Sequence, residues 1–347
     1  MDIVTVARHA GVSTATVSRV LNSSDKVKEA TAARVRASIQ ELQYVPNTSA
    51  RNLRSGRTNV YGLIVSDIRN PFFPDLIEHF ESLATNHGID VTFANTGYSE
   101  ERLLASISRL LERNVDGIAV LTSEVSHAAI DKLRESEVPV VFLNQPQVGS
   151  DFRNITIDYV QGFSDAVEHL RMLGHRKIGF VAGPPVLSSA VRRREAFLTA
   201  LNAHKLPMER EWLLEGDHKT TGGQFAAEHI FSMQNRPTAV VCSNDMTAIG
   251  LLQTAHRLGR NIPGDLSLVG FDGLFLSEIV QPPLTTLYLS RQDIATRAFY
   301  ALQAGTDYKG GAINTVIQPS LVVRASTANA PRTDRGPQRQ QKTDRRR

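Results

Sequence analysis

The sequence predicts an all-α N-terminal head followed by an α/β core of two interwoven sub-domains, each built on a parallel sheet. The first observation is a change of pattern, because residues 3–42 show helical periodicity, whereas β-rich runs alternate with helical stretches from Val60 onward. The second is length, since 347 residues correspond to two or three domains of about 100–200 residues each. The third is composition: 41% hydrophobic and 21% charged residues are typical of a mostly globular chain.

Three short helices are predicted in the head. Gly11 ends the first helix, and Ser13 is suited to cap the second because its hydroxyl can accept a bond from a free backbone N–H. The third is expected from about Thr31 to Leu42 and ends before Pro46, since proline disfavours a helical residue ahead of it. The residues expected to face inward are Val4, Val6, Ala7 and Ala10 in the first helix, Val17, Val20 and Leu21 in the second, and Ala32, Val35, Ile39 and Leu42 in the third.

The core is predicted to hold two sheets. Near-continuous apolar strands separated by helices indicate parallel sheets covered on both faces, and these runs are too many for one small sheet. We expect two sub-domains meeting near residue 158, and strands at Leu287–Leu289 and Thr315–Val323 that return to the sheets and interweave the sub-domains. The other predicted strands are Tyr61–Val65, Asp90–Ala94, Gly117–Leu121, Val138–Leu143, Ile155–Ile157, Lys177–Val181, Ala239–Cys242 and Leu266–Gly270.

Charge is spread unevenly, although the net formal charge is only +4. Residues 1–58 hold nine basic and four acidic side chains, residues 331–347 hold seven and two, and residues 59–330 hold 23 and 29. Two basic ends on an acidic body favour contact with a polyanion at one end or both. The alternative is that both ends are simply solvated flanks.

A cytoplasmic protein without a membrane segment is expected. The single cysteine, Cys242, excludes an internal disulfide and suits a reducing compartment. No apolar run approaches the roughly 20 residues that span a bilayer. The start of the chain lacks the basic stretch and apolar region of a signal peptide.

The first two predicted helices and their glycine turn form a helix-turn-helix, whose second helix can enter the major groove of DNA. Thr14 and Ala15 would face the base edges, and Arg19 could make a bidentate contact with guanine worth about 1–3 kcal/mol of discrimination. Short donors suited to phosphates are Ser13, Thr16, Ser18 and Asn22. From this pattern alone, a small packing bundle without DNA is an equal alternative.

Residues 47–56 could form one short helix with a single large apolar side chain, Leu53. Such a helix is marginal by itself. Its composition fits a hinge helix that folds on DNA, with Leu53 as a wedge in the minor groove and Arg51 and Arg54 on phosphates. A plain interdomain linker is the alternative.

A series of motifs extends over about residues 3–325. It begins with the run Val6–Asn22 and continues in order through Tyr44–Asn47, the hinge ending in Leu53, Gly62–Val65, Asn70–Phe73, Gly174–Gly179, Asn244-Asp245, Val269–Asp272 and Pro283–Thr286. In these motifs and their order, the sequence resembles the LacI–GalR family of bacterial transcriptional regulators. The resemblance implies a dimeric repressor with hinge helices and a core like periplasmic sugar-binding proteins. The residues then expected to contact DNA are Thr5, Ser13, Thr14, Ala15, Thr16, Ser18, Arg19, Asn22, Asn47, Ala50, Arg51, Leu53 and Arg54.

The resemblance also implies an effector site in the cleft of the core. Phe72 and Phe73 follow the first strand, where the family presents side chains to the ligand, and Arg193 matches its ligand-binding arginine. Asn244 and Asp272, each after a strand, match its polar ligand contacts. Ligands of open parallel sheets bind beyond the carboxyl ends of strands, where these groups could bind neighbouring hydroxyls. A surface charge is the alternative for Arg193, which lies in a run of three arginines.

Two positions depart from the family pattern. His218 stands where an aromatic residue often stacks on the ligand, and Leu289 stands where glutamine is common. Both weaken the expectation of an ordinary hexose. His218 could pair with an acidic ligand or cap a loop, and the sequence favours neither.

The expected organisation is a head at 1–46, a hinge at 47–58, a core at 59–330 and a disordered basic tail at 331–347. Within the core, the N-terminal sub-domain is expected at about 59–158 plus 288–316, and the C-terminal one at about 159–287 plus 317–330. The tail has no leucine, isoleucine or valine, so it cannot form the leucine heptad that makes some members tetramers. A homodimer is therefore expected, with a tail that either strengthens nonspecific DNA contact or is solvated.

These expectations describe a transcriptional repressor whose affinity for a pseudo-palindromic operator in double-stranded DNA changes with a sugar-like effector, without a metal or cofactor. A transporter's solute-binding protein would carry a signal peptide and no helix-turn-helix. An enzyme is disfavoured because the nucleotide-binding glycine loops, the zinc-protease motif and the nucleophile elbow are missing from the sequence. His169 and His175 are expected at the surface, and Cys242 as a packed thiol.

Overall fold

The computed structural model describes residues 2–22, 27–44, 57–122, 125–149, 152–305 and 315–331. It divides into two compact units, residues 1–58 and residues 59–347. Most of the predicted hinge and the tail after residue 331 lie outside the described residues. Among the helices of the described ranges, none is long and apolar enough to cross a membrane.

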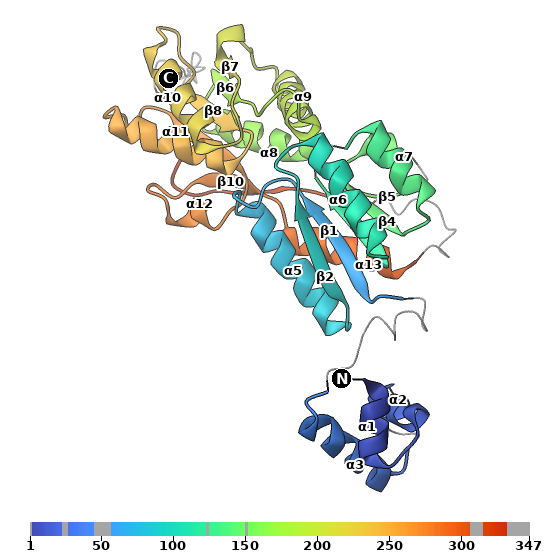
Figure 1. The fold of residues 1–347 in the computed structure, drawn as a ribbon. Coiled ribbons are helices and arrows are strands. Elements are labelled where there is room, and N and C mark those ends of the chain that lie inside the picture. The colour runs from blue at the N-terminus through green and yellow to red at the C-terminus, as the bar shows by residue number, and fades with distance from the viewer. Residues whose placement is uncertain are drawn as a thin grey trace, which may run out of the picture. The chain divides into compact units, whose positions relative to one another are not determined.

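The head unit contains the three predicted helices, α1 (Ile3–Ala10), α2 (Thr14–Asn22) and α3 (Glu29–Glu41) (Figure 1). Gly11 adopts φ +63° after α1, the left-handed conformation that glycine permits. The prediction for Val4 is wrong, because this side chain is 47% exposed. Ile3 takes its place on the inner face, since positions 3, 6, 7 and 10 follow the helical repeat.

The first sheet of the core has the strand order β11-β5-β4-β3-β1-β2, and every pair in it is parallel. Alternate residues of each strand face opposite sides, so Leu63 packs in the apolar cluster with α5 and α13, whereas Ile64 packs with α6 and α7. The strands are β1 (Val60–Val65), β2 (Asp90–Asn95), β3 (Gly117–Leu121), β4 (Val140–Leu143), β5 (Arg153–Ile157) and β11 (Thr315–Ile317), and the helices are α5 (Phe72–Asn86), α6 (Glu100–Glu112), α7 (His127–Glu135), η2 (Pro146–Val148) and α13 (Arg291–Gln303).

The second sheet has the order β12-β10-β9-β8-β6-β7, and only its edge pair, β10 with β12, is antiparallel. One face packs against α8 and α9, and the other against α10 and α11. The strands are β6 (Ile178–Val181), β7 (Leu213–Leu214), β8 (Ala239–Cys242), β9 (Ser267–Asp272), β10 (Thr285–Tyr288) and β12 (Ser320–Val322), and the helices are α8 (Tyr159–Met172), α9 (Ser188–Ala203), η3 (Arg210–Trp212), α10 (Thr220–Ser232), α11 (Asp245–Arg257) and α12 (Leu276–Ile279).

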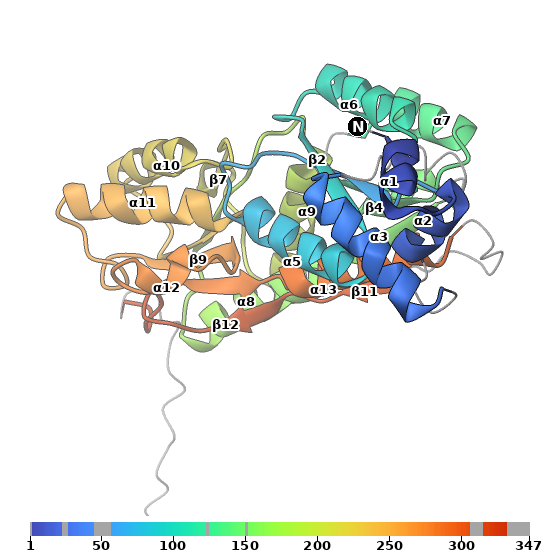
Figure 2. The ribbon, with the colours of Figure 1, turned by 60° about the horizontal axis from the view of Figure 1, so that its bottom comes forward.

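The chain passes between the two sheets three times, which makes the sub-domains interwoven as predicted. It crosses after β5, returns after β10 to α13, and crosses again between β11 and β12 (Figures 1 and 2). The returning segment predicted at Thr315–Val323 consists of two short strands, one in each sheet. Gln318 and Pro319 separate them, and proline cannot donate to a sheet. The short edge strand β7 was not predicted.

Two predictions for single residues have different outcomes. His175 is not at the surface: it is 1% exposed, and its ring lies 2.9 Å from Thr238 Oγ1 and 3.0 Å from the Ala328 carbonyl. It thereby joins the last described segment to the second sub-domain. Cys242 is a buried free thiol in β8, as predicted, and burial raises its pKa.

Candidate functional site

The second helix of the head presents a short row of exposed residues. Ser13, Thr14, Ala15 and Arg19 are exposed, whereas Val17 is fully buried. The hydroxyl of Ser13 accepts a hydrogen bond from the Thr16 backbone N–H at 3.2 Å, so Ser13 caps α2 as predicted. The exposed row starts at this helix end, where DNA-reading helices commonly place their contacts.

The other predicted DNA contacts are partly exposed or lie outside the described residues. Thr16 and Ser18 are half-buried on α2. Thr5 is also half-buried, and its hydroxyl donates to Asp2 at 2.8 Å. Two hydrogen bonds from Thr5, one from its backbone N–H and one from its hydroxyl, lower the pKa of Asp2, which caps α1. The side chain of Asn22 and the residues Asn47, Ala50, Arg51, Leu53 and Arg54 fall outside what the structure describes.

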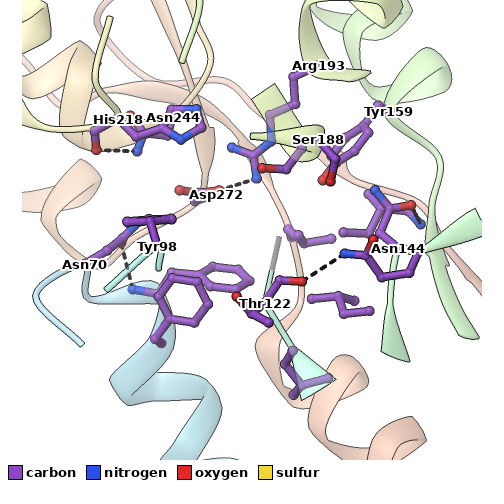
Figure 3. Close-up of a pocket in the computed structure, with 18 residues that line it drawn as sticks. Asn70, Tyr98, Thr122, Asn144, Tyr159, Ser188, Arg193, His218, Asn244 and Asp272 are labelled. Carbon is purple, nitrogen blue, oxygen red and sulfur yellow. Dashed lines mark hydrogen bonds and ion pairs between the residues drawn. The ribbon is translucent and has the colours of Figure 1, made fainter. Parts of the chain in front are cut away.

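The core holds a pocket of about 630 Å³, open to solvent, between the two sub-domains. It lies beyond the carboxyl ends of strands from both sheets, as expected for parallel sheets. The structure brings together all six residues predicted for the effector site, although they span positions 72 to 272 (Figure 3). Leu289, the second departure from the family pattern, also lines the pocket and is 1% exposed.

An ion pair forms the charged part of the pocket. Arg193 on α9 donates to Asp272 Oδ1 at 3.2 Å and to the Ser243 carbonyl, and both side chains are buried (Figure 3). The guanidinium also lies 4.2 Å from the centre of the Phe271 ring, a favourable cation–π distance. A plain surface charge, the alternative for Arg193, is therefore excluded.

Burial raises the pKa of Asp272 to about 6, although the charges of Arg193 and Arg291 act in the opposite direction. Burial also opposes the charge of Arg193, but Asp272 and Tyr159 together outweigh this effect and raise the pKa of the arginine. At neutral pH the pair is thus ionised and has no net charge. Asp272 can accept a ligand hydroxyl, and the Nε of Arg193 has no partner among the described residues.

Phe72 and Phe73 supply an apolar wall at the start of α5. Both are at least nine-tenths buried, and their rings meet edge to face at 5.4 Å. Asn70 fixes this turn, because its Oδ1 accepts the backbone N–H of Phe72 at 3.0 Å. Such a wall suits the apolar face of a small ring or carbon chain.

His218 packs tightly beside Gly183 and is 9% exposed. A Cβ on Gly183 would lie 1.9 Å from His218 Nε2, so only glycine leaves room for this ring. Burial and the charge of Arg193 lower the pKa of His218 to about 3, so the imidazole is neutral at pH 7. Its backbone, at φ +60°, is held by Asn244, whose Nδ2 donates to the His218 carbonyl at 2.8 Å.

Asn244 lines the pocket, but both of its polar atoms are engaged. Its Oδ1 accepts the Thr247 backbone N–H at 2.9 Å and so caps α11, while its Nδ2 holds the loop at His218. The residue therefore shapes the wall, and the direct ligand contact predicted for it remains a prediction.

Several lining residues were missed by the sequence reasoning. Those that follow strands are Asn70, Tyr98, Thr122, Asn144 and Gln145, and those that belong to or precede helices are Tyr159, Ser188 and Ser189. The first group could have been found from the sequence, because each member follows the end of a strand in the first sheet, where the pocket lies. Among the described residues, no cluster of histidine, cysteine and acidic side chains could hold a metal ion.

Comparisons with known proteins match both units. Residues 2–47 match the model of bacterial regulatory proteins of the lacI family, and residues 167–327 match a periplasmic binding protein-like domain. The HTH-type transcriptional repressor PurR of Photorhabdus laumondii is 32% identical over 332 residues, which cover 95% of this chain and 97% of the relative.

Solved structures agree over nearly the whole length. The lac repressor dimer bound to operator and the anti-inducer ONPF superimposes with a TM-score of 0.85 at 26% identity, covering 94% of this chain and 99% of that one. A LacI family regulator from Enterococcus faecium with bound ribose has a TM-score of 0.70 at 25% identity, covering 78% of this chain and all of that one. The predicted fold class is confirmed.

Proposed function

We propose that this chain, which belongs to the lacI family of bacterial regulatory proteins, is a repressor whose operator affinity is set by a small polar effector in the pocket of the core. Membership of the family makes it a DNA-binding transcriptional regulator. The observation that carries the proposal is the pocket itself, where the buried Arg193–Asp272 pair faces the apolar wall of Phe72 and Phe73.

The effector is proposed to be a neutral, hydroxylated molecule such as a sugar or sugar derivative. The pocket offers an ionised carboxylate as acceptor and a guanidinium Nε as donor, and the two charges cancel. His218, whose imidazole is neutral at pH 7, adds no positive charge that would favour an acidic ligand. The bound ribose in the Enterococcus faecium relative supports the same class of ligand.

The chain is proposed to divide at the boundaries expected from the sequence. The head, residues 1–46, would read DNA through the exposed row on α2, and residues 47–58 would form the hinge with Leu53 as a wedge. The core, residues 59–330, would bind the effector. Because three crossovers join its sub-domains, a change in their relative angle would be transmitted to the hinge as a coupling free energy, typically about 1–3 kcal/mol.

A homodimer is proposed as the working form, as in the lac repressor dimer. Phe275 and Ile279 lie four residues apart at α12, and they are 55% and 70% exposed. Large apolar side chains in this exposed position favour burial against a second copy of the chain. Replacing Ile279 with Asp should then shift the full-length protein from dimer to monomer in analytical ultracentrifugation.

The chain is proposed to have no enzymatic activity, although one cluster has the distances of a catalytic triad. Ser164 Oγ lies 3.1 Å from His204 Nε2, and His204 Nδ1 lies 3.0 Å from Glu168. However, Ser164 is inside α8, where the neighbouring N–H groups serve the helix and cannot form an oxyanion hole. The cluster is better explained as a polar contact between α8 and the end of α9.

A thermal-shift screen of the full-length protein against sugars, sugar acids, polyols and nucleosides tests the proposal, followed by DNA binding with each hit. A ligand at one hundred times its Kd stabilises the folded state by about 2.7 kcal/mol, which a melt detects. A hit that changes affinity for the DNA upstream of the protein's own gene supports the proposal and gives the sign of the switch. A hit that leaves DNA affinity unchanged contradicts it and favours a plain binding protein.

A further inference from the structure

One arginine of the second sub-domain reaches across the cleft to the first. Arg192 lies on α9, and Asn144 directly follows β4 in the other sheet. Arg192 Nη1 donates to the Asn144 backbone carbonyl at 3.0 Å and to the side-chain oxygen Oδ1 at 2.9 Å. This contact is separate from the neighbouring Arg193, which points to Asp272 within its own sub-domain.

The same contact fixes the orientation of the Asn144 amide. Oδ1 accepts a second hydrogen bond from the Ile157 backbone N–H at 3.3 Å, so both donors select the oxygen. The other end of the amide, Nδ2, is buried and has no hydrogen-bond partner among the described residues. Asn144 is 6% exposed and lines the effector pocket, and its φ of +55° is a left-handed conformation that asparagine tolerates.

Two unsatisfied donors therefore belong to opposite walls of one pocket. Asn144 Nδ2 belongs to the first sub-domain and Arg193 Nε to the second (Figure 3). A buried donor without a partner is unfavourable, and a ligand oxygen that accepts its hydrogen removes that cost. The pocket thus fits a molecule with acceptor oxygens on two sides.

We propose that Arg192 is a positioning residue for effector recognition: by holding both oxygens of Asn144 from the opposite sub-domain, it directs Nδ2 toward the ligand and keeps the cleft closed. The inference rests on the proposed effector site and adds a residue that does not line it. Arg192 would then serve both closure of the cleft and recognition of the ligand, because it holds the Asn144 amide in the orientation that presents Nδ2 to the ligand. Loss of Arg192 should open the cleft and let the Asn144 amide rotate.

The first experiment measures closure without any ligand. Spin labels on cysteines at Glu101 of α6 and Glu215 after β7, both exposed positions, report the distance between sub-domains in the full-length protein. Cys242 is buried, so it stays unlabelled. Labelled chains are diluted with unlabelled ones, so that each dimer carries one labelled subunit.

Arg192→Met should shift the distance distribution toward a longer, broader one, and Arg192→Lys, which keeps a charged donor, should recover part of the wild-type distribution. Arg194→Met is the matched control on the same helix and should leave the distribution unchanged. An Arg192→Met distribution identical to wild type overturns the proposed closure. Equal changes in Arg192→Met and Arg194→Met also overturn it, because they indicate a general effect on α9.

The second experiment tests positioning through the side-chain amide signal of Asn144 in protein labelled with ¹⁵N-asparagine. Asn144→Asp removes the signal and so assigns it. In Arg192→Met the signal should move toward the shift of a solvent-exposed amide, and in Arg192→Lys it should partly return. A signal that stays in place in Arg192→Met overturns the positioning role. Neither experiment uses DNA or effector, so a failure of the proposed function would be seen in the screen and not here.

Discussion

The exposed row on α2 of the head and the pocket of the core are built in opposite ways. The row lies within one stretch, residues 13–19, and its exposed side chains are held only by their own helix and its cap. The pocket gathers residues from Asn70 to Leu289, which are mostly buried and are held by partners from distant segments. Substitutions in the row that leave the cap at Ser13 intact should therefore change recognition alone, whereas substitutions in the pocket should change recognition and stability together.

The largest effect is expected for Arg193→Met, which keeps most of the volume and removes the charge. Asp272 would be left buried without its ionic partner, which typically costs about 3–5 kcal/mol of unfolding free energy. Urea unfolding of the full-length protein, followed by circular dichroism, measures the loss, and thermal shift should show no response to an effector.

Arg194→Met is the control on the same helix and should lose less than about 1 kcal/mol, as expected away from buried networks. If Arg193→Met is as stable as this control, the ion pair is not a structural part of the pocket, and the contrast between pocket and head is broken.

The next effect is a pH dependence that belongs to the pocket alone. The pKa of Asp272, about 6 when folded, exceeds its unfolded value of about 3.9, so the folded state holds this proton more tightly. Protonated Asp272 contributes fully to the free energy of unfolding below about pH 4. This contribution is lost as the pH rises through about 6, and the total loss is on the order of 3 kcal/mol. The measurement is the unfolding free energy of wild type and Asp272→Asn from pH 4 to 8.

The difference in unfolding free energy, wild type minus Asp272→Asn, should fall between pH 4 and 6 and level off above about pH 7. Burial and then the charge of Asp272 raise the pKa of Asp245 to about 8, so both proteins are compared in an Asp245→Asn background, where this coupled titration is absent. A difference that stays flat or rises with pH contradicts the burial of an ionisable carboxyl at this position.

In the head, Arg19→Ala should weaken operator binding by about 1–3 kcal/mol if the guanidinium reads a guanine. Binding to a scrambled duplex of the same length should change less, because only the operator offers the base contact. Fluorescence anisotropy with both duplexes at fixed salt measures the two affinities. Equal losses would mean that Arg19 contacts phosphate, and any loss of effector response would break the separation of head from core.

The smallest effect is expected for Ser13→Ala, which removes the cap of α2. Loss of an N-cap hydroxyl typically costs about 1 kcal/mol, and here it would affect only the head. Thr14→Ala, at the next exposed position, is the control and should cost less. Hydrogen exchange followed by mass spectrometry should show faster exchange in residues 13–22 and no change in the core, and a change in the core would show that the two units unfold together.

The sequence alone determined the parts of this protein that depend on neighbouring residues. The three head helices, the cap at Ser13 and the succession of apolar strands follow from local periodicity and turn residues, which neighbours in the chain determine. The six residues of the predicted effector site came from the resemblance to a known family, and the rule that the carboxyl ends of parallel strands meet at one edge gave a physical reason for most of them to converge. The same rule, applied to every strand, would also have indicated Thr122 and Asn144.

Only the tertiary structure decided which distant groups meet. It placed the ring of His218 against Gly183, buried His175 and set Arg192 across the cleft from Asn144. The first two depend on which strands are neighbours in the second sheet, and the third depends on the three crossovers, which fix how the two sheets face each other. Local periodicity contains no information about that arrangement, because it reports how each segment is buried and not which segment buries it.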